Sequence, residues 1–187
     1  MIGNTDGHVF VVDLVTGKLL GEMGKSQQHP YIVSLVAISR NLVASSSNPT
    51  IKVWNIDKFT LEYTLQGHTM CIPALVCNLE KQILISGSED ETIRVWNDTE
   101  AVQVISTNRR LSSLSLVNGW DGILVSGGWK KSHRNSEEDS ESNAEDVIQI
   151  WNYISGEILQ TISSNVGVMS ICPLGDDSFA VGNEVHI

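Results

Sequence analysis

The most constraining feature of this sequence is the segment 84–97, which reads LISGSEDETIRVWN. Its first residues are apolar and β-branched, which is typical of a strand, and the small and acidic residues after them favour a tight turn. Residues 92–96 predict a second strand that ends on a large aromatic residue. The segment therefore predicts a β-hairpin with a tryptophan near its far end.

This hairpin recurs along the chain. Trp54 and Trp96 end matching strands that lie 42 residues apart, and Val12 takes the same position 42 residues before Trp54. Trp151 ends a fourth such strand, 55 residues after Trp96. A pattern that repeats about every 40 residues indicates a fold built from copies of one supersecondary unit.

The period of about 40 residues and the Trp-Asn strand ends resemble the WD40 repeat, and the resemblance covers the whole chain. It implies an all-β fold, a WD40 β-propeller, in which each blade is a four-stranded antiparallel sheet. The length allows an incomplete ring of about four blades. Since propellers of this family commonly have seven blades, we expect the chain to be a fragment of such a ring.

The repeat pattern also predicts how the chain divides. We expect the end of a preceding blade at 1–15, blades at 16–55 and 56–97, a blade at 98–152 with a disordered acidic insertion at 129–146, and a blade at 153–187 that is truncated in its last strand. An open arc of this kind would expose an apolar blade face at each end. We therefore expect a piece of a longer protein, or a truncated gene model, whose missing blades belong to the same or a longer chain.

Composition narrows the partners. The formal net charge of −10 argues against binding to a nucleic-acid backbone, which requires basic surface. The sequence has no apolar run of membrane-spanning length, so no membrane association is predicted. Cys71, Cys77 and Cys172 are interpreted as buried thiols in a reducing compartment, which favours a cytoplasmic location, with the nucleus as an alternative.

The resemblance implies a buried hydrogen-bond chain in the second repeat. In WD40 blades a Gly-His pair, a strand serine or threonine, a turn aspartate and the tryptophan are linked. Here the members would be His68, either Ser86 or Ser88 with Ser88 preferred, Asp90 and Trp96. A buried indole N–H needs an acceptor, and a fully satisfied polar network fixes the geometry around it. Trp54 and Trp151 would be the equivalent tryptophans.

Motifs that carry chemistry are missing from the sequence. Its five histidines form neither an HExxH motif nor a Cys/His cluster, so no metal site is predicted. The Ser-Gly-Ser at 86–88 lacks the GxSxG frame of a nucleophile elbow. We therefore predict a protein that is not an enzyme, with no catalytic residues and no cofactor.

Two regions are candidates for binding. The loops before each inner strand and the turns such as 89–91 fall on one face, where WD40 proteins commonly bind peptides. Residues on that face include Tyr31, Met70, Glu89, Arg109 and Arg110. The adjacent arginines would suit an acidic or phosphorylated partner, although ordinary solvated loops are the alternative. In the insertion, Ser136 and Ser142 each precede an acidic residue by three positions, so they are candidate phosphorylation sites, unless the insertion has no function.

The sequence thus predicts a non-catalytic scaffold that binds other proteins or peptides on the loop face of a propeller. A substrate-recognition segment of a ubiquitin ligase, of the F-box or TRAF-like WD kind, is the leading alternative. A regulatory propeller of an enzyme is a more distant one.

Overall fold

The computed structural model describes residues 2–3, 7–24, 32–117, 119–129, 146–164, 167–175 and 178–182. Within these ranges every regular element is a strand, so the predicted all-β fold is confirmed. None of the residues in these ranges belongs to a helix with the length and apolar character needed to cross a membrane.

Three complete four-stranded antiparallel sheets form the middle of the chain. The first sheet contains β4 (Ser34–Ala37), β5 (Leu42–Ser47), β6 (Thr50–Asn55) and β7 (Thr60–Leu65). The second sheet contains β8 (Ala74–Asn78), β9 (Ile83–Gly87), β10 (Thr92–Asn97) and β11 (Glu100–Ser106). The third sheet contains β12 (Arg110–Leu116), β13 (Ile123–Trp129), β14 (Asp146–Asn152) and β15 (Glu157–Ser164).

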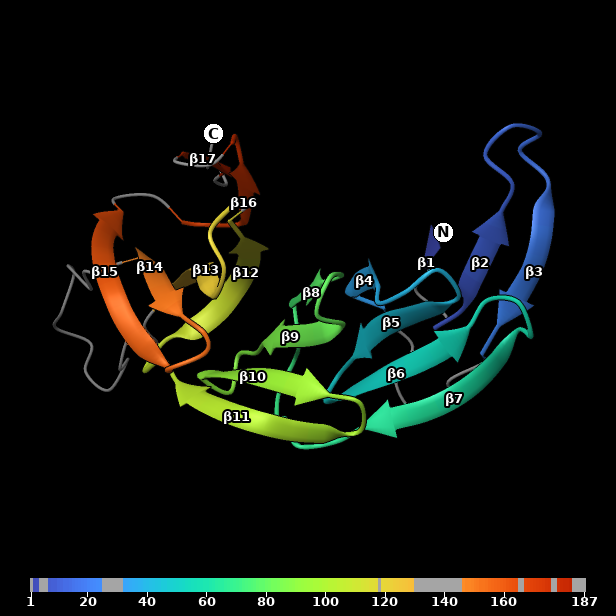
Figure 1. Cartoon of the computed structure of the whole chain (residues 1–187), viewed down its shortest axis with the longest axis horizontal. Coiled ribbons are helices and arrows are strands. Elements are labelled where there is room, and N and C mark those ends of the chain that lie inside the picture. The colour runs from blue at the N-terminus through green and yellow to red at the C-terminus, as the bar shows by residue number, and fades with distance from the viewer. Residues whose placement is uncertain are drawn as a thin grey trace, which may run out of the picture.

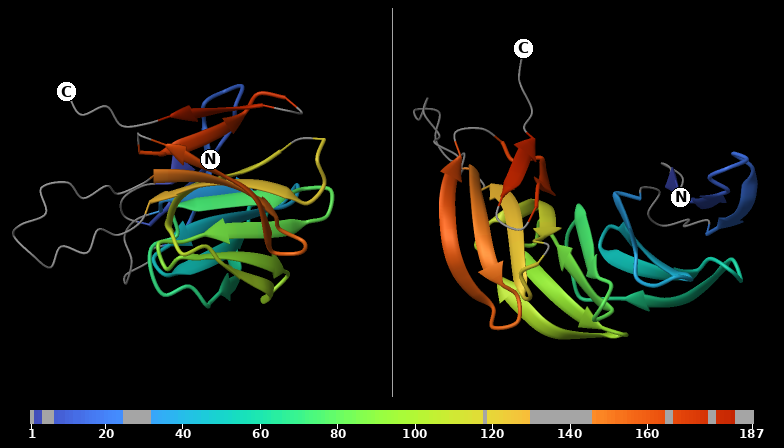
Figure 2. Two further views of the ribbon diagram at one scale, coloured as in Figure 1. Left: turned by 90° about the vertical axis from the view of Figure 1, so that its left-hand side faces the viewer. Right: turned by 45° about the horizontal axis from the view of Figure 1, so that its top comes forward.

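Two smaller sheets flank them. The N-terminal sheet contains β1 (Ile2–Gly3), β2 (Val9–Val12) and β3 (Leu19–Met23), and the C-terminal sheet contains β16 (Ser170–Pro173) and β17 (Phe179–Gly182). The sheets follow one another along an open arc, with the N-terminal and C-terminal sheets at its two ends (Figure 1). The rotated views show them standing face to face in succession rather than closing a ring (Figure 2).

The sheets are shifted by one strand from the predicted blades. The strand that opens each predicted repeat pairs with the strand before it, as β3 does with β2 and β7 with β6. The complete sheets therefore span 34–65, 74–106 and 110–164, whereas the repeats were placed at 16–55, 56–97 and 98–152. Each third strand forms a hairpin with the strand that follows it, which places that strand in the same sheet rather than in the next one.

Trp54, Trp96 and Trp151 occupy equivalent positions, as predicted from the repeat. Each is the next-to-last residue of a third strand, β6, β10 or β14. In each case a β-bulge on the pairing with the fourth strand falls directly before the tryptophan, and in the N-terminal sheet it falls before Val12. The same irregularity at the same position in four sheets marks one repeated unit.

The core lies between neighbouring sheets. Trp96 packs in a buried cluster with Ile51, Val53 and Leu65 of the first sheet, and Trp151 packs with residues of the second sheet such as Ile93 and Ile105. Each tryptophan thus covers the face of the preceding sheet. A large aromatic side chain is therefore buried at each junction that a complete sheet makes with the sheet before it, and this burial stabilises the contact.

The predicted insertion is shorter than expected at both ends. Trp129 is the last residue of β13 and pairs with Arg110, and Asp146 is the first residue of β14, so both belong to strands rather than to the loop 129–146. Both residues still pair with a neighbouring strand, Trp129 with Arg110 and Asp146 with Ser164, so the strands extend further than predicted. The rest of the insertion, with the candidate sites Ser136 and Ser142, lies outside the described residues, as does Tyr31.

Candidate functional site

A buried hydrogen-bond chain runs through the second sheet. The indole N–H of Trp96 donates to the Ser86 hydroxyl over 2.8 Å. That hydroxyl lies 2.7 Å from His68 Nε2, and His68 Nδ1 lies 2.8 Å from Asp90 Oδ2. One arrangement satisfies every group, in which the Ser86 hydroxyl donates to Nε2 and the Nδ1–H of the neutral imidazole donates to the carboxylate.

The serine in this chain is Ser86, not Ser88, so the preferred sequence prediction was wrong at this member. Ser86 lies on β9 opposite Arg94, two residues from Trp96 on the neighbouring strand. Ser88 lies beyond the end of β9, where its hydroxyl donates to the Cys71 carbonyl over 2.8 Å and accepts from the Asp90 N–H over 3.1 Å. It shapes the turn instead of holding the indole.

Asp90 lies at the outer end of this hydrogen-bond chain. Burial alone raises the pKa of its carboxyl, but hydrogen bonds from His68 and Thr92 outweigh that effect, and the pKa lies well below its usual range. The N–H of Thr69 also donates to Oδ2, over 3.0 Å, and further lowers the pKa. The carboxylate therefore stays ionised while it ties the 67–69 segment to the turn after β9.

The order Ser86–His68–Asp90 is that of a hydrolase triad, but its surroundings exclude that use. Ser86 has no exposed surface, and its oxygen already accepts the Trp96 indole N–H. A nucleophile must be reachable by its substrate, which this hydroxyl is not. Across the part of the chain that the structure describes, no three His, Cys, Asp or Glu residues are grouped so as to hold a metal ion. The arrangement is structural.

A loop face lies directly beside this chain. We use the name loop face for segments 69–72, 88–91 and 107–110. Backbone hydrogen bonds join them: the Glu89 N–H donates to the Cys71 carbonyl over 2.9 Å, and the Thr107 N–H donates to the Glu91 carbonyl over 2.9 Å. The Leu111 N–H donates to the Ser88 carbonyl over 3.2 Å, which connects the second sheet to the third.

The predicted partner-binding residues Met70, Glu89, Arg109 and Arg110 lie on this loop face, all half-buried. Both arginines, which the sequence predicted to suit an acidic or phosphorylated partner, already lie near carboxylates of this chain. Arg110 Nη1 lies 3.8 Å from Glu89 Oε2, an ion pair between two sheets. Burial raises the pKa of Asp146, and the positive charge of Arg109 partly offsets that rise, so Arg109 also faces a carboxylate. The loop face therefore carries both signs of charge.

Comparisons with known proteins agree with this geometry. A family model described as "WD domain, G-beta repeat" matches residues 59–97. A chain of the crystal structure of the mitotic checkpoint complex superposes with a TM-score of 0.73 at 20% identity, covering 90% of this chain and 48% of that one. Residues 59–97 thus match a WD40 repeat, and the fold of the chain is that of a WD40 β-propeller.

Curated WD40-containing relatives are larger. The chain is 23% identical over 161 residues to apoptotic protease-activating factor 1 of Rattus norvegicus and 24% identical over 161 residues to that of Homo sapiens, covering 86% of this chain and 12% of either relative. It is 31% identical over 110 residues to nuclear distribution protein PAC1 of Coccidioides posadasii, covering 54% of this chain and 22% of the relative. It thus spans less than a quarter of these relatives' length.

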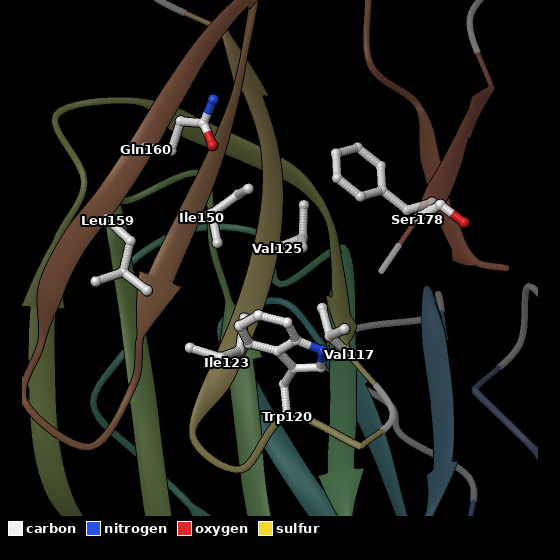
Figure 3. Close-up of a pocket in the computed structure, with 9 residues that line it drawn as sticks. Val117, Trp120, Ile123, Val125, Ile150, Leu159, Gln160 and Ser178 are labelled. Atoms are coloured by element: carbon white, nitrogen blue, oxygen red, sulfur yellow. The ribbon is translucent and has the colours of Figure 1, made fainter. Parts of the chain in front are cut away.

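Two features of this WD40 segment were missed from the sequence. Gln103 in β11 hydrogen-bonds across to the turn that follows β14, and an apolar groove lies beside Trp120, whose side chain is 56% exposed. Gln103 carried no signal in a single sequence, because its partner is 50 residues away. Trp120 lies in the connection between β12 and β13, and the apolar residues that share the groove with it come from strands far apart in the sequence (Figure 3), so no local pattern marks them.

Proposed function

We propose that this WD40 segment is a non-catalytic scaffold that binds peptide or protein partners on its loop face. The observation that carries the proposal is the set of backbone hydrogen bonds that fixes three loops from two sheets against one another. The buried chain from Trp96 to Asp90 stiffens the central loop of the three. A surface that is already ordered loses less conformational entropy on binding, which favours recognition there.

The charges of the loop face favour a partner with an acidic group next to an apolar one. A carboxylate or phosphate can compete with Glu89 for Arg110, because the existing ion pair is long and partly exposed. Met70, half-buried on the same loop face, offers apolar contact to a neighbouring side chain of the ligand. We therefore still propose an acidic or phosphorylated ligand, as predicted from the sequence. That ligand would have to displace Glu89 from Arg110.

The test is a peptide-display selection on the purified chain, followed by affinity measurements on the selected peptides. The double variant Arg109→Glu/Arg110→Glu should lose binding of acidic or phosphorylated peptides, and Met70→Ala should weaken it. Lys58→Glu is the matched control, since Lys58 is an exposed cation in the turn between β6 and β7, at the opposite end of its sheet. Equal binding by all variants would overturn the proposal.

Three further predictions from the sequence remain proposals. The first is that this segment recognises substrates for a ubiquitin ligase, which would require an F-box or similar domain elsewhere in the same protein. The second is a cytoplasmic or nuclear location, which is checked by localising the protein in its own cells. Phosphorylation of Ser136 and Ser142 is checked by the intact mass of protein isolated from its own cells. A mass without phosphate-sized increments on the insertion would contradict it.

A further inference from the structure

In two of the three complete sheets, the turn between the third and fourth strands fills the space next to the preceding sheet. In the third sheet this turn consists of residues 153–156. Tyr153 is 2% exposed and packs against the second sheet, where its hydroxyl accepts a hydrogen bond from Asn78 Nδ2 over 3.2 Å. In the first sheet the turn consists of residues 56–59, and Ile56 packs against the N-terminal sheet. A large side chain thus closes both junctions at this end.

The second sheet has no such side chain in its turn. β10 ends at Asn97 and β11 begins at Glu100, so residues 98 and 99 alone form the turn, which is shorter than in the other two sheets. Asp98 holds the position of Ile56 and Tyr153, two residues after the tryptophan, and it is exposed. The space that those two side chains fill elsewhere is therefore left open between the first and second sheets.

The residue that would receive a longer turn also lacks its contact. Tyr63, Gln103 and Gly21 hold one register position on the fourth strands of their sheets. Gln103 hydrogen-bonds the turn of the third sheet, and the Phe59 ring of the first sheet's turn packs against Gly21. Within the described ranges, the Tyr63 hydroxyl takes part in no hydrogen bond. It is therefore available to a group from outside the chain.

A cavity of about 100 Å³ lies at this junction, between two complete sheets in the middle of the chain. Its lining includes the apolar residues Leu42, Leu84 and Trp96 and the polar residues Tyr63, Gln82 and Asp98. The tryptophan and Leu84 are buried, whereas Gln82 and Asp98 are exposed, so the floor is apolar and the mouth is polar. The volume exceeds what one water molecule needs, and it leaves room for the end of a long side chain.

The mouth of this cavity is negatively charged. Among the described residues that line it, Asp98 alone carries a charge, and none of the ion pairs formed in that part of the chain involves Asp98. Burial raises the pKa of the Tyr63 hydroxyl, and the negative charges of Asp98 and Glu62 raise it further. Tyr63 therefore stays neutral beside two carboxylates, and the mouth attracts a cation.

From these observations we propose that this cavity is a second binding site, which takes the lysine or arginine side chain of a basic segment in a partner protein. The methylenes of that side chain contact the floor at Leu84 and Trp96, and its charged end donates to the Asp98 carboxylate. The Tyr63 hydroxyl supplies a further acceptor. The site lies at the opposite end of the second sheet from the turn 88–91, so it uses no residue of the loop face and is independent of the function proposed above.

Titration with short peptides, followed by nuclear magnetic resonance, tests the site. The probes are blocked glycine pentapeptides whose central residue is lysine, arginine, acetyl-lysine or leucine. The lysine and arginine peptides should shift the indole N–H signal of Trp96 saturably, with a Kd in the millimolar range. The acetyl-lysine and leucine peptides should bind at least about tenfold more weakly, because neither side chain is charged. Equal binding by all four peptides, or no saturable shift with any of them, would overturn the proposal.

Variants assign the preference for charge to one residue. Asp98→Asn should weaken binding of the lysine peptide about tenfold, since it removes the charge but keeps a short side chain that tolerates the φ of 51° at this position. Tyr63→Phe should weaken it less, because it removes a neutral acceptor. Asp57→Asn is the matched control, since it makes the same change in the corresponding turn of the first sheet.

Two further measurements separate binding from folding and from the loop face. The midpoint of thermal unfolding of Asp98→Asn should match that of Asp57→Asn, which shows that the loss of binding does not come from unfolding. The double arginine variant of the loop face should bind the lysine peptide like the wild type, so either site can fail without the other. Binding of the lysine peptide by Asp98→Asn with the wild-type Kd contradicts the proposal.

Discussion

The second and third sheets are built alike up to one point and then differ. In both, the tryptophan N–H donates to a serine, over 2.8 Å from Trp96 and 2.9 Å from Trp151. In the second sheet the serine is bound in turn by His68, which reaches Asp90. The third sheet has Thr107-Asn108 in place of the Gly67-His68 pair, and the Thr107 hydroxyl lies 3.0 Å from the Glu91 carbonyl and 2.7 Å from that of Arg109.

This difference separates two roles. The tryptophan–serine bond is the repeated element, and it orients the indole over the preceding sheet. The histidine and aspartate are an addition that holds the turn at 88–91, and that turn carries part of the loop face. The packing of the sheets and the shape of the loop face are therefore set by different residues, and variants can separate them.

The largest loss of stability should come from replacing the tryptophan that both sheets share. Trp96→Ala and Trp151→Ala should each lower the free energy of unfolding by about 3–5 kcal/mol, because each removes an almost fully buried aromatic side chain from a junction between sheets. Urea denaturation followed by circular dichroism measures the loss. Trp120→Ala is the control, because the Trp120 side chain is 56% exposed. Equal losses in all three variants would contradict the proposed equivalence of the repeat positions.

The next largest loss of stability should come from replacing a member of the His68–Asp90 pair. His68→Ala should cost about 2–3 kcal/mol, since it removes the charge-assisted hydrogen bond to the Asp90 carboxylate and leaves the buried Ser86 hydroxyl without an acceptor for its proton. Thr107→Ala, in the corresponding segment of the third sheet, should cost about 1 kcal/mol, because it removes only a neutral hydroxyl. The same denaturation experiment compares them. A larger loss at Thr107 would reverse the assignment of roles.

Acid should weaken the second sheet more than the third. Because the pKa of Asp90 is lower in the folded chain than its ordinary value of 3.8, the folded state binds fewer protons than the unfolded state. The stabilisation is present in full above that ordinary value and is lost as the pH falls below it. The midpoint of thermal unfolding should therefore decrease with falling pH in the wild type, and Asp90→Asn should flatten this dependence. An unchanged slope in the variant would exclude Asp90 as its source.

The smallest effect is expected at the end of β13. Trp129 is half-buried and covers no neighbouring sheet in the way that Trp96 and Trp151 do, so Trp129→Ala should cost about 1 kcal/mol. Thermal unfolding compares it with Trp151→Ala in the same sheet. A loss as large as that of Trp151→Ala would show that this strand end carries more packing than its exposure indicates.

The sequence was informative where the determinant is local or repeated. The Trp-Asn strand ends predicted the fold and the equivalence of Trp54, Trp96 and Trp151, because each third strand has the same neighbours in its own hairpin. The sequence could not decide between Ser86 and Ser88, because both serines flank the same glycine. Only the end of β9 at Gly87 determines that Ser86 lies on the strand and reaches the indole. The partner of Arg110 was also out of reach, because Glu89 belongs to another sheet.

The β-bulge before each tryptophan has a consequence for how the chain behaves when concentrated. Among the described residues, the outermost strands β7, β11 and β15 each pair on one side only, and they carry exposed apolar residues such as Leu61, Val102 and Leu159. A straight strand of that kind would be a template for runaway aggregation. The extra residue at every bulge bends this outer rim and breaks its regular spacing of donors and acceptors, so a foreign strand cannot add along its whole length.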